Sequence, residues 1–333
     1  MATAPPRQPR LRLGVVGLGR LWEARYRPAL ARMADRARVV ALYDQVARRA
    51  TAEAAALRCA AVDGLTDLID RPDVDALLLL TPQWFGLHPV ALAAERGKPV
   101  YCALPVAGDP GGLEDLAPRI VAGGAAFVPE LARRAYPASV RLKELLATKL
   151  GPARLILGHV RLGGFDRYGA PGPSSQTSPS TLLQDPGGNV VDWCRWVFGA
   201  EPTTVQGVGA VAIAGEVPGR DFESIALGFD GGGLARVDIA QHHRAAWGEN
   251  MRLPPAPGFA VYAERGYAWL EMPDALRWVD ADGPRDERLP LEPTLGEVLL
   301  DQFLKRIRGE PSDAPGLDDA LAASRLVARL KGG

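Results

Sequence analysis

A pair of glycines near the start of the chain has the spacing of a phosphate-binding turn. Gly17-Leu18-Gly19-Arg20-Leu21 follows the apolar run Leu11–Val16 directly and opens a segment with helical periodicity. In a dinucleotide-binding turn the first glycine makes the tight turn, the second lets the backbone approach the pyrophosphate, and the helix N-terminus binds the anion. A third glycine normally follows, and Trp22 stands in its place. The turn could therefore bind a nucleotide, or be a nucleotide-free turn in which Trp22 fills the site.

An acidic residue stands where such a site would need one. Asp44 ends the second apolar run, Val39–Tyr43. A carboxylate at this place accepts hydrogen bonds from the adenosine ribose hydroxyls and repels a 2′-phosphate, which favours NAD over NADP. Arg48 and Arg49 follow closely and weaken that preference. The pattern therefore predicts NAD as the cofactor and leaves NADP open.

Few other residues could exchange protons, since the chain has four histidines and five lysines. His159 lies in a strand-like run at 154–162, just before a Gly/Pro/Ser-rich loop at 163–181. His159 could be a catalytic base at an unusual position, or a structural histidine that is hydrogen-bonded within the sheet. His88 comes shortly after Thr81-Pro82 and could either reach the cofactor or begin a helix.

The remaining histidines and the cysteines do not predict a metal site. His242-His243 has no carboxylate or cysteine at ligand spacing. Cys59, Cys102 and Cys194 are odd in number, widely spaced and without a CxxC motif. They are typical of a protein in a reducing compartment.

The composition excludes several classes of protein. The chain has 333 residues, is 47% apolar and carries 39 basic and 39 acidic residues. That length suggests about two globular domains, and the balanced charge gives no electrostatic footprint for nucleic acid or an anionic membrane. The start lacks the apolar run of a signal peptide, and no run reaches the ~18 residues of a membrane span. We therefore expect a soluble, cytoplasmic protein.

The elements that must position these residues fall into two patterns. Over about the first 130 residues, strands that are apolar throughout alternate with helices, which indicates βαβ units and a parallel sheet covered on both faces. Later strands are separated by turns such as Asp230-Gly231-Gly232-Gly233, as in an antiparallel sheet. The sequence predicts a disordered tail at 1–9, a doubly wound α/β (Rossmann) domain at 10–133 and an α+β domain at 134–333.

Several linked motifs occur in a fixed order along nearly the whole chain. They are Leu13-Gly14-Val15-Val16-Gly17-Leu18-Gly19, Thr81-Pro82, Gly97-Lys98-Pro99-Val100-Tyr101-Cys102-Ala103-Leu104-Pro105, Arg133-Arg134-Ala135-Tyr136-Pro137 and Leu182-Leu183-Gln184-Asp185-Pro186-Gly187-Gly188-Asn189-Val190-Val191-Asp192. In this order the chain resembles the Gfo/Idh/MocA family, mostly NAD(P)-dependent sugar and cyclitol oxidoreductases. The resemblance implies a large, mostly antiparallel open sheet that builds homodimers or homotetramers, and a sugar-like substrate. With the turn itself, it implies cofactor contacts from Gly17, Leu18, Gly19, Arg20, Leu21, Asp44, Thr81, Pro82 and His88.

The family's proton-transfer residues are substituted. The lysine of its Glu-Lys-Pro motif is Leu104, and the histidine of its Asp-x-Gly-x-His motif is Asn189. Leucine neither donates nor accepts a proton, and asparagine cannot exchange one near neutral pH, although it can hydrogen-bond a substrate. The aspartate of that motif remains as Asp185, either a catalytic group or a helix cap. The candidates for catalysis are therefore Asp185, Asn189 and His159.

Three functions are compatible with these residues. The first is an NAD(P)-dependent oxidoreductase acting on a sugar or polyol, with an atypical proton-transfer site. The second is a catalytically inactive relative that binds a nucleotide or sugar, or serves as an assembly module. The third is redox-neutral chemistry that uses bound NAD transiently.

Overall fold

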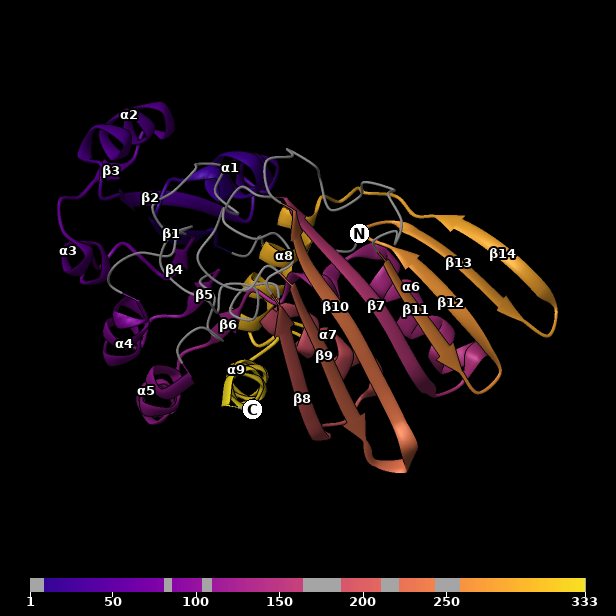
Figure 1. Cartoon of the computed structure of the whole chain (residues 1–333). Helices are drawn as coiled ribbons and strands as arrows, with labels where there is room; N and C mark the ends of the chain where they lie inside the picture. The colour runs from indigo at the N-terminus through magenta and orange to yellow at the C-terminus, as the bar shows by residue number, and fades with distance from the viewer. Residues whose placement is uncertain are drawn as a thin grey trace. The chain divides into compact units, whose positions relative to one another are not determined.

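The computed structural model in Figure 1 describes residues 9–80, 86–103, 110–163, 187–210, 222–242 and 258–332. The chain divides into two compact units. The first unit contains Met1–Leu104, Gly111–Glu130 and Gly296–Leu317, and the second contains Pro105–Pro110, Leu131–Leu295 and Asp318–Gly333.

The first unit is built on a six-stranded parallel sheet in the order β3-β2-β1-β4-β5-β6. The middle strands are apolar throughout: all four residues of β4 are buried, as sequence patterning predicts for a sheet covered on both faces. This order, with the chain reversing direction across the sheet after β3, is the doubly wound arrangement and confirms the predicted fold of this part. The strands are β1 (Leu11–Val16), β2 (Ala37–Tyr43), β3 (Ala60–Ala61), β4 (Ala76–Leu79), β5 (Val100–Cys102) and β6 (Phe127–Pro129).

The helices of this unit connect successive strands, and one comes from far along the chain. The helix from far along the chain is α8 (Leu295–Ile307). It contacts the rest of the unit through the ion pairs Arg32–Glu297 (2.9 Å) and Arg36–Asp301 (2.5 Å). The sequence predicted a linear division at residue 133, whereas the structure groups 296–317 with the first unit. The other helical segments are η1 (Trp22–Tyr26), α1 (Arg27–Arg32), α2 (Ala47–Leu57), α3 (Leu65–Ile69), α4 (His88–Glu95) and α5 (Pro110–Gly123).

The second unit contains an eight-stranded sheet in the order β14-β13-β12-β11-β7-β10-β9-β8. Among the described strands of this sheet, β7 and β10 form the one parallel pair, so the sheet is mostly antiparallel, as expected. The strands are β7 (Ala153–Gly163), β8 (Pro202–Ala210), β9 (Phe222–Phe229), β10 (Gly233–His242), β11 (Gly258–Ala263), β12 (Gly266–Glu271), β13 (Ala275–Asp280) and β14 (Gly283–Arg288). The helical segments are η3 (Ala132–Ala135), α6 (Pro137–Leu145), η4 (Leu146–Leu150), α7 (Gly188–Phe198), η7 (Asp230–Gly232) and α9 (Leu317–Gly332).

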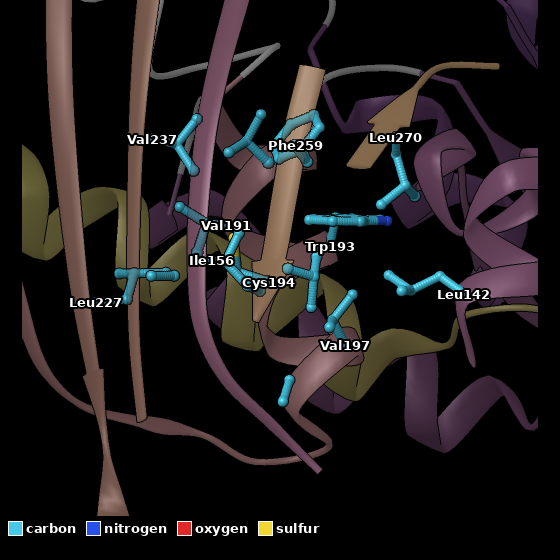
Figure 2. Close-up of a cluster of buried hydrophobic side chains, with 14 of the residues drawn as sticks. Leu142, Ile156, Val191, Trp193, Cys194, Val197, Leu227, Val237, Phe259 and Leu270 are labelled. Carbon is cyan, nitrogen blue, oxygen red and sulfur yellow. The ribbon is translucent and has the colours of Figure 1, made fainter. Parts of the chain in front are cut away.

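One face of this sheet is covered by helices and forms the core. Alternate strand residues such as Ile156, Val237 and Phe259 pack against Trp193 and Val191 of α7 (Figure 2). The rings of Trp193 and Phe259 lie 4.5 Å apart. Side chains of α6 and α9 complete the same cluster, so the three helices share this face.

The opposite face carries exposed apolar side chains. We call it the open face and define it by five residues, Leu157, Val208, Leu234, Tyr262 and Tyr267, whose exposed fractions run from 39% to 70%. Each alternates with a residue of the helix-covered face, for example Leu157 with Ile156.

Candidate functional site

The glycine turn lies at the carboxyl end of β1, between β2 and β4. Gly17 has φ +91°, a backbone conformation that favours glycine, and its N–H donates to the carbonyl of Tyr43 at 2.9 Å. The carboxyl edge of a doubly wound sheet, at the point where strand order reverses, is where such folds bind nucleotides. The position of the turn therefore fits the predicted cofactor site.

The helix that follows the turn begins with backbone N–H groups that have no acceptor within the helix. The N–H of Glu23 donates to the carbonyl of Gly19 at 3.1 Å and begins the helical ladder. The N–H groups of Arg20, Leu21 and Trp22 precede that ladder, as in the first turn of any helix. Such donors, together with the helix dipole, bind phosphate oxygens.

Trp22, at the position of the third glycine, is directed to a neighbouring helix. Its side chain is 2% exposed, and its indole N–H donates to Oε1 of Glu53 in α2 at 3.3 Å. The same oxygen accepts a hydrogen bond from Nε of Arg27 at 2.5 Å. The large side chain is thus accommodated by packing between η1, to which Trp22 belongs, and α2.

Asp44 connects the glycine turn to the start of α2. Its Oδ2 accepts a hydrogen bond from the N–H of Leu18 and its Oδ1 accepts one from the N–H of Val46, both at 2.8 Å. Nη1 of Arg49 lies 3.4 Å from Oδ2. The carboxylate is only 8% exposed, so it holds the backbone of the turn in addition to the ribose contact predicted for it.

The turn, the helix N-terminus and Asp44 together fit a dinucleotide. Gly17, Leu18, Gly19, Arg20 and Leu21 are the residues predicted to contact its pyrophosphate. His88 is the first residue of α4 and is exposed. Thr81 and Pro82, the other expected contacts, lie outside the described residues, as does Leu104.

A buried polar cluster lies at the carboxyl ends of β5 and β6, and sequence reasoning missed it. The hydroxyl of Tyr26 donates to Oε2 of Glu130 at 2.5 Å and lies 2.7 Å from the hydroxyl of Tyr101. Arg25 pairs with Oε1 of Glu130 at 2.6 Å. Burial, and then the charge of Glu130, raise the pKa of both tyrosines well above the ordinary value. Both tyrosines therefore stay protonated and act as hydrogen-bond donors. Through these hydrogen bonds η1, which contains Tyr26, is fixed to the sheet.

In the second unit, strand ends meet at one edge of the sheet. β7 ends at Gly163, β9 begins at Phe222, β10 ends at His242 and β11 begins at Gly258. The strand register places these strand ends side by side: Ala240 of β10 pairs with Phe222 of β9, and Gly258 of β11 pairs with His159 of β7. We call this the loop edge, since connecting segments leave and enter here. Loops at one edge of a rigid sheet are common places for binding residues.

Asn189 and His159, two of the catalytic candidates, lie on different faces of this sheet. Asn189 is half-buried in the first turn of α7, on the helix-covered face. His159 alternates with Val160, which is in the helix-covered core, and so belongs to the face of Leu157. Asp185 lies outside the described residues.

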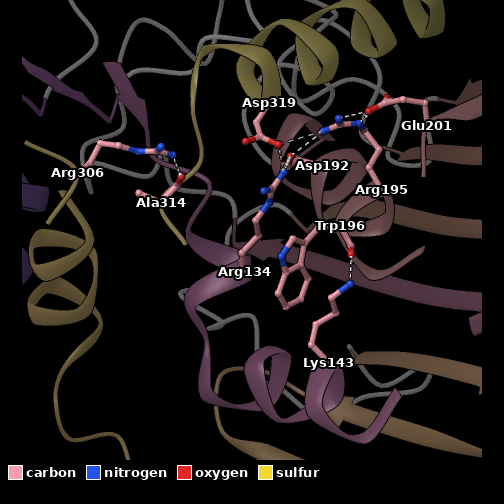
Figure 3. A network of polar contacts seen from close by, with 9 residues as sticks. All are labelled: Arg134, Lys143, Asp192, Arg195, Trp196, Glu201, Arg306, Ala314 and Asp319. Atoms are coloured by element: carbon pink, nitrogen blue, oxygen red, sulfur yellow. Dashed lines mark hydrogen bonds and ion pairs between the residues drawn. The ribbon is translucent and has the colours of Figure 1, made fainter. Parts of the chain in front are cut away.

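Asp192, one turn further along α7, belongs to an ion-pair network (Figure 3). It is 1% exposed and accepts hydrogen bonds from Arg134, at 2.7 Å from Nε, and from Arg195, at 3.2 Å. Asp319 also pairs with Arg134, at 2.7 Å. Burial outweighs these cations and raises the pKa of Asp192. The network holds α7 to η3 and α9, a structural role for Asp192.

The described residues contain neither a metal-binding cluster nor a membrane-spanning helix. Among the described residues, no group of three or more His, Cys, Asp or Glu side chains is placed to hold a metal ion. No helix in the described ranges combines the length and apolar character needed to cross a bilayer.

The first unit, with its doubly wound sheet, glycine turn and Asp44, has the architecture of a dinucleotide-binding Rossmann domain. Residues 11–127 match the family model GFO_IDH_MocA, described as "Oxidoreductase family, NAD-binding Rossmann fold". The first unit is therefore similar to this family of NAD-binding oxidoreductases.

Named relatives match over parts of the chain. An inositol 2-dehydrogenase of Ralstonia nicotianae is 30% identical over 203 residues, 59% of this chain and 57% of that protein. A dTDP-3,4-didehydro-2,6-dideoxy-alpha-D-glucose 3-reductase of Streptomyces antibioticus is 39% identical over 108 residues, 32% of this chain and 33% of that protein. The chain thus spans between a third and just over half of the length of these relatives.

Solved structures share the fold over nearly the whole chain. An oxidoreductase from Agrobacterium radiobacter, in complex with NAD+, L-tartaric acid and magnesium, has a TM-score of 0.82 at 16% identity. The match covers 97% of this chain and 96% of that one.

Proposed function

We propose that the protein is an NAD-dependent oxidoreductase that acts on a CH–OH group of a sugar or polyol-like substrate, with NADP as a second possible cofactor. The observation that carries this is the glycine turn held to Asp44 through the N–H of Leu18. The inositol dehydrogenase and sugar reductase among the relatives support the substrate class.

In this proposal the bound dinucleotide supplies hydride acceptance at its nicotinamide. The chain's own residues bind and orient: the donors at Arg20 and Leu21 hold the pyrophosphate, and Asp44 holds the turn and the ribose. Removing a hydride from an alcohol carbon also requires removal of the hydroxyl proton, for which a positioned base contributes roughly 10²–10⁴-fold. Asn189 can hydrogen-bond the substrate hydroxyl but not take that proton, and Asp185 is the acidic candidate carried by the motif.

Titration with NADH and NADPH, followed by fluorescence, tests the cofactor assignment. Saturable binding of NADH with a well-folded sample is expected, and binding of neither nucleotide would contradict the proposal. Turnover is then measured on a panel of polyols, cyclitols and sugars with NAD+, with Asp185→Ala as the variant expected to lose it.

A catalytically inactive relative is the second candidate, favoured by the substitutions at Leu104 and Asn189. It predicts nucleotide or sugar binding with no net change in NADH on any substrate of the panel. Reproducible turnover that is lost in Asp185→Ala decides against it.

We further propose that the chain forms homodimers or homotetramers through the open face. Apolar residues that are exposed in one chain and gather on one sheet face indicate an interface. Leu157→Asp and Tyr262→Asp are each expected to shift the mass measured by light scattering toward the 35.5 kDa of one chain. Val121→Asp, at a residue 70% exposed on α5, is the control and should leave the mass unchanged.

A cytoplasmic location is part of the proposal. All three cysteines are free, which is the state expected in a reducing compartment.

A further inference from the structure

A buried carboxylate interrupts the apolar series of β9. On the helix-covered face of this strand, Ile225, Leu227 and Phe229 are 1% to 5% exposed and belong to the core. Glu223 is the first residue of the same series and is 2% exposed. Burying a carboxylate costs free energy even when it is paired, and sites that break the local pattern in this way are often functional.

The register places Glu223 in the row nearest to the loop edge. Glu223 pairs with Ile239 of β10, and Ile239 pairs with Val160 of β7. The next row inward contains Ile225, and Phe229 lies at the far end of the strand. Glu223 is thus next to the ends of the strands where the connecting segments of the second unit begin.

α7 extends toward this row from the far end of the sheet. Its last residue, Phe198, stacks on Phe229 with ring centroids 4.0 Å apart, and the helix packs against β7 and β10. From Phe198 back to Asn189 the helix covers about 14 Å at 1.5 Å per residue. From Phe229 back to Glu223 the strand covers about 20 Å at 3.4 Å per residue. Asn189 and Glu223 are therefore on the same face, both toward the loop edge.

Glu223 and Asn189, the residue at the position of the family's histidine, thus share one face and one end of the sheet. We propose that Glu223 is a proton-transfer residue of the substrate site, in place of the histidine substituted by Asn189. The inference rests on the proposed oxidoreductase function and extends it to a residue outside the family's motifs.

The substrate O–H bond breaks and its proton goes to the Glu223 carboxylate, while the C–H bond breaks and the hydride goes to NAD+. The C–O bond becomes C=O, so the alcohol is oxidised to a carbonyl and NAD+ is reduced to NADH. Glu223 then releases the proton to solvent.

Glu223→Gln tests the rate, because it keeps the shape of the side chain and removes the proton acceptor. On any polyol that the wild type oxidises, kcat should fall roughly 10²-fold or more, and the acidic limb of the pH–rate profile should disappear. The Kd for NADH should stay unchanged. The control is Asp238→Asn, a carboxylate on the adjacent strand whose neighbours Val237 and Ile239 face the core, so that it faces away from Glu223. It should keep the wild-type rate.

A rate and pH profile for Glu223→Gln equal to those of the wild type would overturn the proposal. So would a variant whose activity falls only in proportion to a loss of folded protein in thermal unfolding, because that result indicates a structural role.

A second measurement does not depend on turnover. Conduritol B epoxide, a cyclitol epoxide, forms an ester when a carboxylate oxygen attacks an epoxide carbon, and the opened alkoxide takes a proton from water. Peptide mapping by mass spectrometry should find this ester on Glu223, reduced by an excess of myo-inositol and absent from Glu223→Gln. Folded protein with no ester at Glu223 overturns the inference. NADH titration reports separately on the proposed function, so the two failures can be told apart.

Discussion

The carboxylate of Asp44 and the backbone N–H of Leu18 are joined by a hydrogen bond of 2.8 Å across 26 positions of the sequence. The bond fixes the glycine turn at the end of β1 to the end of β2. The residue predicted to contact the ribose therefore also shapes the turn predicted to bind the pyrophosphate.

Asp44→Ala should weaken NADH binding by 10-fold or more, because it removes the acceptor of the Leu18 and Val46 N–H groups. Leaving a buried donor without an acceptor costs about 1–3 kcal/mol, so the free energy of unfolding in urea should also fall. Asp44→Asn keeps one acceptor oxygen and should lose less on both measures. Wild-type NADH affinity in Asp44→Ala would contradict this role for the carboxylate.

Arg49→Ala should change the preference between NAD and NADP. The guanidinium lies 3.4 Å from Asp44 and is half exposed, so it can pair with a 2′-phosphate that Asp44 alone would repel. We expect the NADP+ affinity to fall roughly 10-fold or more relative to NAD+, since a charge-assisted hydrogen bond contributes about 1.5–3 kcal/mol. Arg38→Ala, an exposed arginine of β2, is the control. An unchanged affinity ratio in Arg49→Ala would show that this residue does not select the cofactor.

Trp22→Phe should keep NADH affinity and lower the free energy of unfolding by about 1 kcal/mol, the net value of one hydrogen bond. The hydrogen bond lost is the one to Glu53. Trp22→Gly restores the common glycine but leaves a cavity in place of a buried indole, which costs about 3–5 kcal/mol. Unfolding in urea and NADH titration check both variants. A large gain in NADH affinity in Trp22→Gly would instead indicate that the indole occupies the nucleotide site.

Because of Tyr26 and Tyr101, the free energy of unfolding should fall at high pH. Their folded-state pKa is raised, so above the ordinary value near 10 the unfolded chain loses protons that the folded chain keeps. The stabilisation is complete below pH 10 and is lost as the pH rises, at up to about 2.7 kcal/mol per pH unit for two groups. Urea unfolding between pH 9 and 11 measures the slope. The double variant Tyr26→Phe/Tyr101→Phe should have a clearly smaller slope, and an equal slope would assign the effect to other groups.

Much of the fold could be predicted from the sequence, because buried parallel strands are apolar throughout and helices carry an apolar stripe. β1 and β2 were found in this way, from the apolar runs Leu11–Val16 and Val39–Tyr43. β14, Gly283–Arg288, was missed because its residues are polar or charged: it is an edge strand, held by pairing with β13. The place of α8 could not be predicted either, since it depends on contacts such as Tyr101–Phe303 that no local pattern shows.

The candidate site was predictable where a backbone conformation requires a particular residue. Gly17 is the clearest case, since its positive φ is the reason for a glycine there. The sequence could not show that the carboxylate of Asp44 accepts a hydrogen bond from the N–H of Leu18. Nor could it show that the indole of Trp22 donates a hydrogen bond to Glu53 of α2. For Glu223 a signal was present, a charged residue in the apolar series that continues with Ile225 and Leu227. It becomes meaningful only when the register places it at the loop edge.

The contribution of α8 to the first unit affects how the protein is made. The strand β6 is followed by the whole stretch from Leu131 to Leu295 before the ribosome reaches Gly296. At ~5–20 residues per second, these 165 residues take roughly 10–30 s. During that time the nascent nucleotide-binding sheet lacks the helix that contributes Phe303 and the partners of Arg32 and Arg36. The first unit is therefore completed only after the eight-stranded sheet of the second unit has been synthesised.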